Sequence, residues 1–229
     1  MGRRRSGGRR RLARLALVLV LVPPLAVATA LVAYRWVQPP ATTLQLVRLA
    51  QGYGFTRELV RAAELGPHLL RAVIAAEDNR FCRHAGVDWA AFAHEWRRWR
   101  AGERPRGAST ITMQLTRNLF LWPDRSRVRK ALELAAAPLT DALVSKPRQL
   151  VLYLNQVEFA PGVYGAEAGA RHWFDRPAAA LTAGEAARLV ALLPAPLTAT
   201  TTDAAVRRRA ARIGTRLDQL GDLLACAPG

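Results

Sequence analysis

Cysteine is scarce in this sequence, which contains only Cys82 and Cys226 among its 229 residues. One possible pair is too few for the disulfide framework of a small secreted domain. We expect the two thiols to be unpaired. Cys82 and His84 lack the spacing of a structural zinc site, and no second Cys/His pair follows them. We therefore expect no metal site built from protein ligands.

Acidic residues are also few, since 17 Asp and Glu stand against 34 Lys and Arg, a formal charge of +17. Seven arginines crowd residues 1–14, and an apolar run over 15–33 follows that is long enough to span a bilayer. Tyr34 and Trp36 lie where interfacial aromatic anchors are found. The positive-inside rule predicts a cytoplasmic tail (1–14), a transmembrane anchor (15–36) and a chain that continues outside the cytoplasm.

The same N-terminal segment has an alternative interpretation as a cleaved signal peptide. Ala28, Thr29 and Ala30 form a possible signal-peptidase site, after which the protein would be released. The apolar run continues past this site to Ala33, however, and is longer than the apolar region of a usual signal peptide. Its length and its flanking arginines favour an uncleaved anchor.

A run of bases and aromatics, EWRRWR at residues 95–100, resembles a nucleic-acid-binding surface. We expect no nucleic-acid partner, because a chain exported across a membrane rarely meets nucleic acid. Two interpretations stay open. The run is either an amphipathic patch on an anionic membrane surface or a solvated helix face with two buried tryptophans.

Beyond the anchor, the apolar residues recur at helical spacing and no segment shows sustained strand alternation. We expect a mainly α fold, with a mixed connector (37–66) leading to a domain at 67–225. The predicted helices cover residues 69–77, 89–100, 109–119, 127–144, 146–157, 166–174, 183–193 and 203–224. The predicted N-terminal caps are Asp88, Ser109, Ser145, Thr182 with Glu185, and Asp203.

Two carboxylates are candidates for chemistry. Glu77 ends an apolar helical run, where a partly desolvated carboxylate suits a general base. Glu133 lies four residues after Arg129, so its simplest alternative is an exposed helical ion pair. Arg129, Lys130 and Lys146 are nevertheless the kind of cations that a pyrophosphate leaving group requires.

Polar side chains near these carboxylates are candidates for substrate binding. Ser109, Thr110, Thr112, Gln114 and Asn118 supply many hydrogen-bond donors over ten residues, and helix capping accounts only for Ser109. Three other candidates have structural alternatives. Asp78 can brace a turn, His84 can order a loop, and Asn155 can be a satisfied core amide.

Taken together, these segments resemble the motifs of the peptidoglycan glycosyltransferases of family 51. Within this family the chain most resembles the monofunctional, membrane-anchored enzymes. The same domain also forms the N-terminal half of the bifunctional class A penicillin-binding proteins. The resemblance covers residues 69–196 in five segments. EDNRFCRHAGVD (77–88) is similar to EDxxFxxHxGxD, RGASTITMQLTRN (106–118) to GGSTITQQLxKN, RKALE (129–133) to RKxxE, SKPRQLVLYLNQVEF (145–159) to SKxxILexYLN, and EAARLVALLPAP (185–196) to the last family motif.

Four positions depart from the family pattern. Ala108 and Ala160 replace glycines, Met113 replaces a glutamine that could contact substrate, and Arg117 replaces a lysine. The loop at Ala160 must differ from that of the family if its glycine needs a positive φ. Neither candidate carboxylate is lost, so we expect activity.

The resemblance implies an α-helical, lysozyme-like domain that polymerises lipid II into β-1,4-linked glycan. The reaction would invert MurNAc C1 and release undecaprenyl pyrophosphate. Glu77 would be the general base and Glu133 the second catalytic carboxylate. Substrate-binding roles would fall to Asp78, Phe81, His84, Ser109, Thr110, Gln114, Asn118, Arg129, Lys130, Lys146 and Asn155.

The resemblance also implies the surroundings of the enzyme. It would lie in the bacterial inner (plasma) membrane with its catalytic domain in the periplasm, where it meets lipid II and the growing lipid-linked glycan. A divalent cation, Mg²⁺ or Mn²⁺, would bridge the pyrophosphate oxygens. Cell-wall synthesis or division proteins are expected partners.

Two other classes of function compete with this one. A muralytic, lysozyme-like enzyme also uses a glutamic acid, but it needs neither the Arg129–Lys130 pair nor an anchor. A non-catalytic scaffold of a wall-building complex would not need Glu77 and Glu133. The chain ends soon after its last predicted helix, so we expect no transpeptidase domain and no reaction with penicillin.

Overall fold

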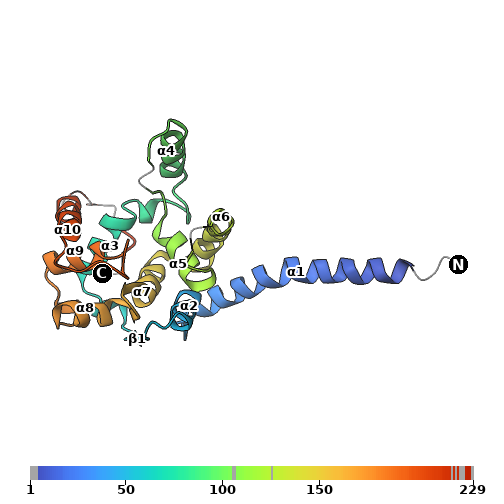
Figure 1. Ribbon diagram of the computed structural model, residues 1–229, viewed down its shortest axis with the longest axis horizontal. Helices are drawn as coiled ribbons and strands as arrows, with labels where there is room; N and C mark the ends of the chain where they lie inside the picture. Colours follow the sequence, from blue (N-terminus) through green and yellow to red (C-terminus); the bar gives the residue numbers. More distant parts are fainter. Residues whose placement is uncertain are drawn as a thin grey trace.

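The computed structural model describes residues 5–104, 107–124, 126–217, 219, 221 and 225–227. Over these residues the chain forms ten α-helices and three short strands, so the prediction of a mainly α fold is confirmed. Figure 1 shows a long N-terminal helix, α1, that projects from a helical body. A second helix, α4, stands off from that body (Figure 1).

The projecting helix α1 (Arg5–Tyr34) has the properties of a membrane anchor. Its segment Leu17–Tyr34 has a mean hydropathy of 2.3 and is only 6% buried. Within the described ranges it is the one helix long and apolar enough to cross a bilayer. This agrees with the single N-terminal span expected from the sequence.

The base of α1 is packed against the body. Leu31 is fully buried in the main core, and the ring of Tyr34 stacks on that of Phe120 at a centroid distance of 6.4 Å. The guanidinium of Arg148 donates hydrogen bonds to the carbonyl oxygens of Tyr34 (2.8 Å) and Val37 (2.6 Å). The last turn of the anchor is therefore part of the folded domain.

Apart from α4 (Trp89–Arg100), which has no buried residue, the remaining helices form the body around one main apolar core. They are α2 (Thr43–Ala50), α3 (Pro67–Glu77), α5 (Ile111–Phe120), α6 (Arg127–Leu143), α7 (Lys146–Gln156), α8 (Ala166–Phe174), α9 (Ala183–Ala191) and α10 (Ala204–Leu217). Three 3₁₀ turns are η1 (Ala62–Glu64), η2 (Phe81–Arg83) and η3 (Ala178–Ala180). Helix α10 packs on α3 and α9, while α5 packs between α6 and α7. The two groups meet where α3 ends and α5 begins.

A three-stranded sheet ties the predicted connector to the domain. Strand β1 (Thr56–Arg57) pairs in parallel with β3 (Val163–Tyr164), which pairs antiparallel with β2 (Glu158–Ala160). These strands are too short to show alternation in the sequence. Ala160 itself has no positive φ and is buried, so this loop accepts alanine where the family has glycine.

The helix caps agree with the predictions in two cases and differ in one. The Asp88 carboxylate accepts a hydrogen bond from the Ala91 N–H, and Thr182 forms a capping box with Glu185. The predicted cap Ser109 was wrong, because Thr110 caps α5 by accepting from the Met113 N–H. One extra residue of extended backbone precedes the helix and shifts the cap.

Two other capping predictions have a limited outcome. Ser145 precedes α7 but its side chain makes no capping hydrogen bond. Asp203 precedes α10 and accepts from the Thr200 N–H. The predicted apolar stripe of α10 is buried at Val206, Ala210 and Ile213, whereas Leu220 and Leu224 lie outside the described residues.

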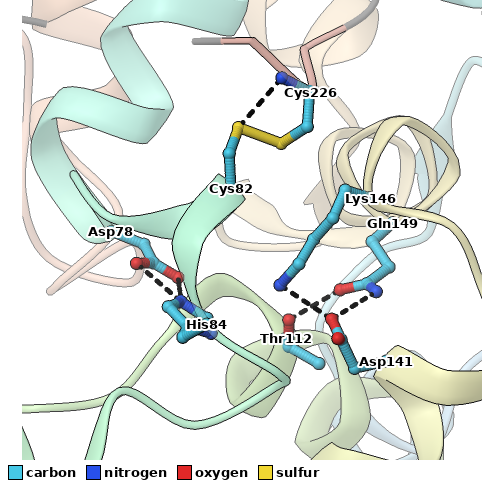
Figure 2. Close-up of a disulfide and its surroundings, with 8 residues drawn as sticks. All are labelled: Asp78, Cys82, His84, Thr112, Asp141, Lys146, Gln149 and Cys226. Carbon is cyan, nitrogen blue, oxygen red and sulfur yellow. Dashed lines mark hydrogen bonds and ion pairs between the residues drawn. A yellow bond between two sulfur atoms is a disulfide. The ribbon is translucent and has the colours of Figure 1, made fainter. Parts of the chain in front are cut away.

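The expectation of two unpaired thiols was wrong, since Cys82 and Cys226 form a disulfide. Cys82 lies in η2, and the chain after α10 returns to it across 144 residues of sequence (Figure 2). The Cys226 N–H also donates to the Cys82 sulfur at 3.1 Å. Only the packing of α10 against α3 brings these segments together, and the cysteine spacing carries no sign of it.

Helix α4 presents its tryptophans to solvent rather than to the core. Trp96 and Trp99 are 50% and 53% exposed, which excludes the interpretation with two buried tryptophans. Their rings lie in a row with Phe92 at centroid distances of 6.4 and 5.0 Å. The surface is an aromatic face on a basic helix.

Candidate active site

Glu77 is the last residue of α3 and lies in a cleft of about 540 Å³. Its Oε2 accepts a hydrogen bond from the Gln114 amide at 2.9 Å, and its Oε1 pairs with the Arg209 guanidinium at 2.6 Å. The carboxylate is thus fixed by groups from α5 and α10. Its side chain is 13% exposed, so it is largely desolvated yet open to the cleft.

A buried tyrosine orients the Gln114 side chain that contacts Glu77. The Tyr153 hydroxyl donates to the side-chain amide oxygen Oε1 of Gln114 at 2.9 Å. The NH₂ group of the same side chain is therefore directed at Glu77. Burial, followed by the negative charge of Glu77, raises the pKa of Tyr153 well above its ordinary value. Tyr153 therefore remains a neutral donor at physiological pH. The amide orientation of Gln114 follows from this donor.

The Glu77 cleft has an acidic floor and a basic wall. Its lining includes Glu77, Asp78, Asp88, Ser109, Thr110, Arg209, Arg212 and Arg216. The three arginines come from one face of α10, because positions 209, 212 and 216 are three and four residues apart. An anionic ligand beside Glu77 would meet this basic wall.

Asp78 and His84 hold the turn after Glu77 in place. The Asp78 carboxylate contacts the His84 Nε2 at 2.9 and 3.0 Å and accepts a hydrogen bond from the Ile111 N–H at 3.0 Å (Figure 2). Asp78 thereby connects the end of α3 to the start of α5. His84 is largely buried and Phe81 is fully buried. Among these three, only Asp78 lines the cleft.

The glycine of this turn has a defined steric reason. Gly86 has a φ of +82°, and a Cβ there would lie 2.5 Å from the Ala137 carbonyl oxygen and 2.9 Å from the Pro138 nitrogen. The turn therefore packs directly on the α6 backbone at its proline. The Thr110 hydroxyl donates to the Gly86 carbonyl at 2.6 Å, so this threonine is a structural residue as well as part of the cleft lining.

Glu133 is the centre of a second charged cluster. It is buried, with 1% of its side chain exposed, and it pairs with the Arg129 guanidinium at 3.2 Å and the Lys130 ammonium at 3.0 Å. The alternative of an exposed ion pair is thus excluded for Glu133. The Lys130 ammonium also donates to the Ser109 hydroxyl at 2.6 Å. Ser109 links this cluster to the Glu77 cleft.

Burial lowers the pKa of Lys130 below its ordinary value. The hydrogen bond and charge of Glu133 oppose this shift, whereas the positive charges of Arg117 and Arg129 add to it. Glu133 therefore favours the protonated form of Lys130 among the other cations.

A second cleft of about 460 Å³ lies on the other side of this cluster. Arg129 lines it together with Arg117, Asn118, Arg48, Glu158 and the segment 193–198. The side-chain amide oxygen Oδ1 of Asn118 accepts a hydrogen bond from the Arg117 Nε at 3.2 Å. Ser109, Lys130, Glu133 and Arg129 thus form a polar path from one cleft to the other.

Two predicted site residues are not part of this arrangement. The Lys146 ammonium pairs with Asp141 at 2.7 Å and lies 4.4 Å from the centroid of the Phe81 ring (Figure 2). It does not join Arg129 and Lys130, because the start of α7 faces η2. Asn155 is fully buried and exchanges hydrogen bonds with the backbone of Val60, which is the core-amide alternative.

The sequence did not reveal the burial of Met113 or the contribution of α10 arginines to the site. Met113 is fully buried against Val87 and Ala137, so this departure from the family removes no group from either cleft. Arg209 was missed as a site residue, although its helix was predicted. The basic face of that helix was the available signal, but its partner Glu77 lies 132 residues away.

The described part of the chain contains no group of three or more His, Cys, Asp or Glu side chains placed to hold a metal ion. Glu133, the carboxylate nearest the cationic cluster, already has two cations as partners. The protein residues therefore do not fit a divalent cation of their own at this position.

Comparison with known proteins gives a consistent result. Residues 45–218 match the family model described as transglycosylase. The chain is 47% identical over 211 residues to a protein of Rhodospirillum centenum named biosynthetic peptidoglycan transglycosylase, with 91% of each chain covered. Proteins of the same name from Caulobacter vibrioides (41% over 189 residues, 82% of each chain) and Rhizobium meliloti (40% over 220 residues, 95% and 92%) are also similar.

Proposed function

This chain belongs to the transglycosylase family, and we propose that it polymerises lipid II into β-1,4-linked peptidoglycan strands. The growing lipid-linked glycan is the donor and lipid II is the acceptor. The reaction inverts MurNAc C1 and releases undecaprenyl pyrophosphate. The observation that carries this proposal is the placement of Glu77 in a cleft with a basic wall, beside the buried Arg129–Lys130–Glu133 cluster.

Glu77 acts as the general base in this proposal. It takes the proton from the acceptor GlcNAc 4-hydroxyl while that oxygen attacks the donor C1. Gln114 and Arg209 each occupy one side of the carboxylate, but each carboxylate oxygen has a further lone pair for the substrate. The fixed orientation lowers the entropic cost of reaching the transition state.

Arg129 and Lys130 stabilise the departing pyrophosphate. Glu133 holds both cations at 3.2 and 3.0 Å, so their charges are in place before the bond to C1 breaks. Arg129 also lines the second cleft, which provides an anionic group with access to the cluster. Glu133 is a positioning residue in this scheme.

Among the described residues, no group of three or more His, Cys, Asp and Glu side chains is placed to hold the divalent cation expected from the family resemblance. We propose that any such cation accompanies the pyrophosphate oxygens of the substrate. No step of the mechanism depends on it, because Arg129 and Lys130 already face the developing negative charge.

The anchor determines where the reaction takes place. Its apolar segment Leu17–Tyr34 fits a single membrane span, and the arginine-rich residues before it favour an N-terminus in the cytoplasm. We propose that the domain lies on the periplasmic face of the inner membrane. Both lipid substrates are then present in the same bilayer.

The test is polymerisation of labelled lipid II by the full chain in detergent. The native protein should make glycan that lysozyme digests, and Glu77→Gln should lower the rate by about 10²–10⁴-fold with little change in stability. Glu64→Gln, a surface control, should retain full activity. A folded native chain that makes no polymer would support a scaffold, and one that cleaves preformed glycan instead would support a muralytic enzyme.

A further inference from the structure

The disulfide between Cys82 and Cys226 joins two segments that each adjoin residues of the Glu77 cleft. Cys82 lies in η2, five residues after Glu77 and four after Asp78, both of which line the cleft. Cys226 follows α10, whose residues Arg209, Arg212 and Arg216 form the arginine wall of the cleft. Gln219, between α10 and Cys226, also lines the cleft. The covalent bond therefore links the segment that follows Glu77 to the segment that follows the arginine wall.

The arginine wall requires a restraint on physical grounds. Three guanidinium groups share one cleft, and Glu77, the carboxylate that forms an ion pair with them, engages only Arg209. Asp78 is already occupied by His84 and the backbone of α5. Like charges brought together repel one another, so the unliganded cleft favours movement of α10 away from α3.

Non-covalent contacts hold α10 along its apolar side. Val206, Ala210 and Ile213 are buried in the core, and Leu217 in the last turn packs against it half-buried. The last turn is also tied to α3 by two hydrogen bonds, from Arg71 to the Leu217 carbonyl and from Arg216 to the Ala75 carbonyl, both 3.4 Å long. Bonds of this length are weak. Beyond Leu217, the disulfide is the covalent link among the described residues between the chain after α10 and the segment after α3.

We propose that Cys82 and Cys226 are positioning residues whose disulfide holds the arginine wall of α10 against the Glu77 cleft, so that substrate retention depends on the oxidised form. This inference rests on the proposed function. The restrained wall is preorganised for the anionic substrate, and its loss costs binding more than it costs the chemical step at Glu77.

The same proposal gives a defined response to a dithiol reductant. Two electrons and two protons pass from the dithiol to the disulfide, which leaves two thiols on the enzyme and a disulfide on the reductant. The end of α10 is then held by its weak hydrogen bonds and by the packing of Leu217. The cleft becomes looser at Arg216 and Gln219, while Glu77 keeps its contacts with Gln114 and Arg209.

The experiment compares the oxidised full chain, the same protein after reduction, and the Cys82→Ser/Cys226→Ser variant. Initial rates of lipid II polymerisation in detergent are measured against substrate concentration. We expect KM to rise about tenfold with kcat changed less than threefold, in both the reduced protein and the double variant. Mass spectrometry of the alkylated protein verifies that the disulfide is reduced. The reduced native protein tests the proposal even if the double variant does not fold.

A matched control separates positioning from general destabilisation. Val151→Ala removes buried methyl groups from α7, in a cavity beside the base of α1 that shares no lining residue with the Glu77 cleft. It should lower the urea concentration at which the protein unfolds, with an unchanged KM. Hydrogen exchange should speed up at the last turn of α10 on reduction, and not in α5.

The outcomes are distinct for the two proposals. No polymer from the oxidised native chain contradicts the proposed function itself. Polymer formation with the same KM in oxidised, reduced and double-variant protein overturns the positioning role of the disulfide. An equal rise of KM in Val151→Ala overturns it as well, because the effect would then follow from stability alone.

Discussion

Glu133 is the residue at which charge and stability are most closely coupled. Its buried carboxylate faces two cations, so Glu133→Gln leaves Arg129 and Lys130 close together without their anion. We expect a loss of about 2–4 kcal/mol in the free energy of unfolding, less than for a fully buried pair because 35% of the Lys130 side chain is exposed. Urea unfolding measures it, with the exposed Glu64→Gln as a surface control expected to unfold at the same urea concentration as the native chain.

This loss should depend on pH in a defined direction. Burial already lowers the pKa of Lys130 in the folded state, so between that value and its ordinary value the unfolded chain binds more protons. Stability therefore rises with pH across this window. Glu133→Gln removes a group that raises the pKa of Lys130 and extends the window to lower pH. The variant should recover part of its stability as the pH rises toward the ordinary lysine pKa of 10.5, and an unchanged deficit would contradict this account.

The sequence was most informative about individual residues where chemistry and spacing agreed. The site residues predicted from the sequence include Glu77, Glu133, Arg129, Lys130 and Ser109. In the structure Glu77 and Ser109 line one cleft, Arg129 lines a second, and Lys130 and Glu133 connect Ser109 to Arg129. Lys146 and Asn155 were chosen for residue type within a motif, but their partners are the side chain of Asp141 and the backbone of Val60. A polar residue in a motif can serve the fold, and its partners are visible only in three dimensions.

At the scale of elements, the start of α5 carries a testable correction. The Thr110 hydroxyl accepts from the Met113 N–H and donates to the Gly86 carbonyl, whereas the Ser109 hydroxyl accepts from Lys130. Thr110→Ala should therefore lower stability by about 1–2 kcal/mol. Thr110→Ser should recover most of this loss, and Ser109→Ala should cost less than Thr110→Ala. Thermal or urea unfolding of the three variants shows which hydroxyl caps α5. A larger loss of stability for Ser109→Ala than for Thr110→Ala would identify Ser109 as the cap.

Helices were predictable because each carries an apolar face or a cap in its own sequence. The strands were not, since two or three residues are too few to show alternation. Arg209 and the disulfide were missed for a common reason. Both depend on the packing of α10 against α3, a contact between segments more than 130 residues apart. Local patterns contain no information about such pairings.

At the scale of the whole molecule, we expect the two ends of α1 to contribute differently to the stability of the domain. Leu17 to Leu25 are exposed to the surroundings, whereas Leu31 is fully buried and Tyr34 stacks on Phe120. A chain beginning at residue 27 should keep the stability of the full protein. One beginning at residue 37 should lose about 3–5 kcal/mol, because it removes Leu31 and the Tyr34 partner of Arg148. Urea unfolding of both truncated chains measures this difference, and equal stabilities would show that the last turn of α1 is only a tether.

The docking of that last turn has a mechanical consequence for the growing strand. In the membrane orientation that we propose, a flexible stalk would let the catalytic body tumble above the lipid surface, whereas an anchor whose last turn is packed into the core transmits its tilt to the body. The body would then keep one side toward the lipid and turn mainly about the helix axis. New glycan would consequently leave at a constant height above the membrane.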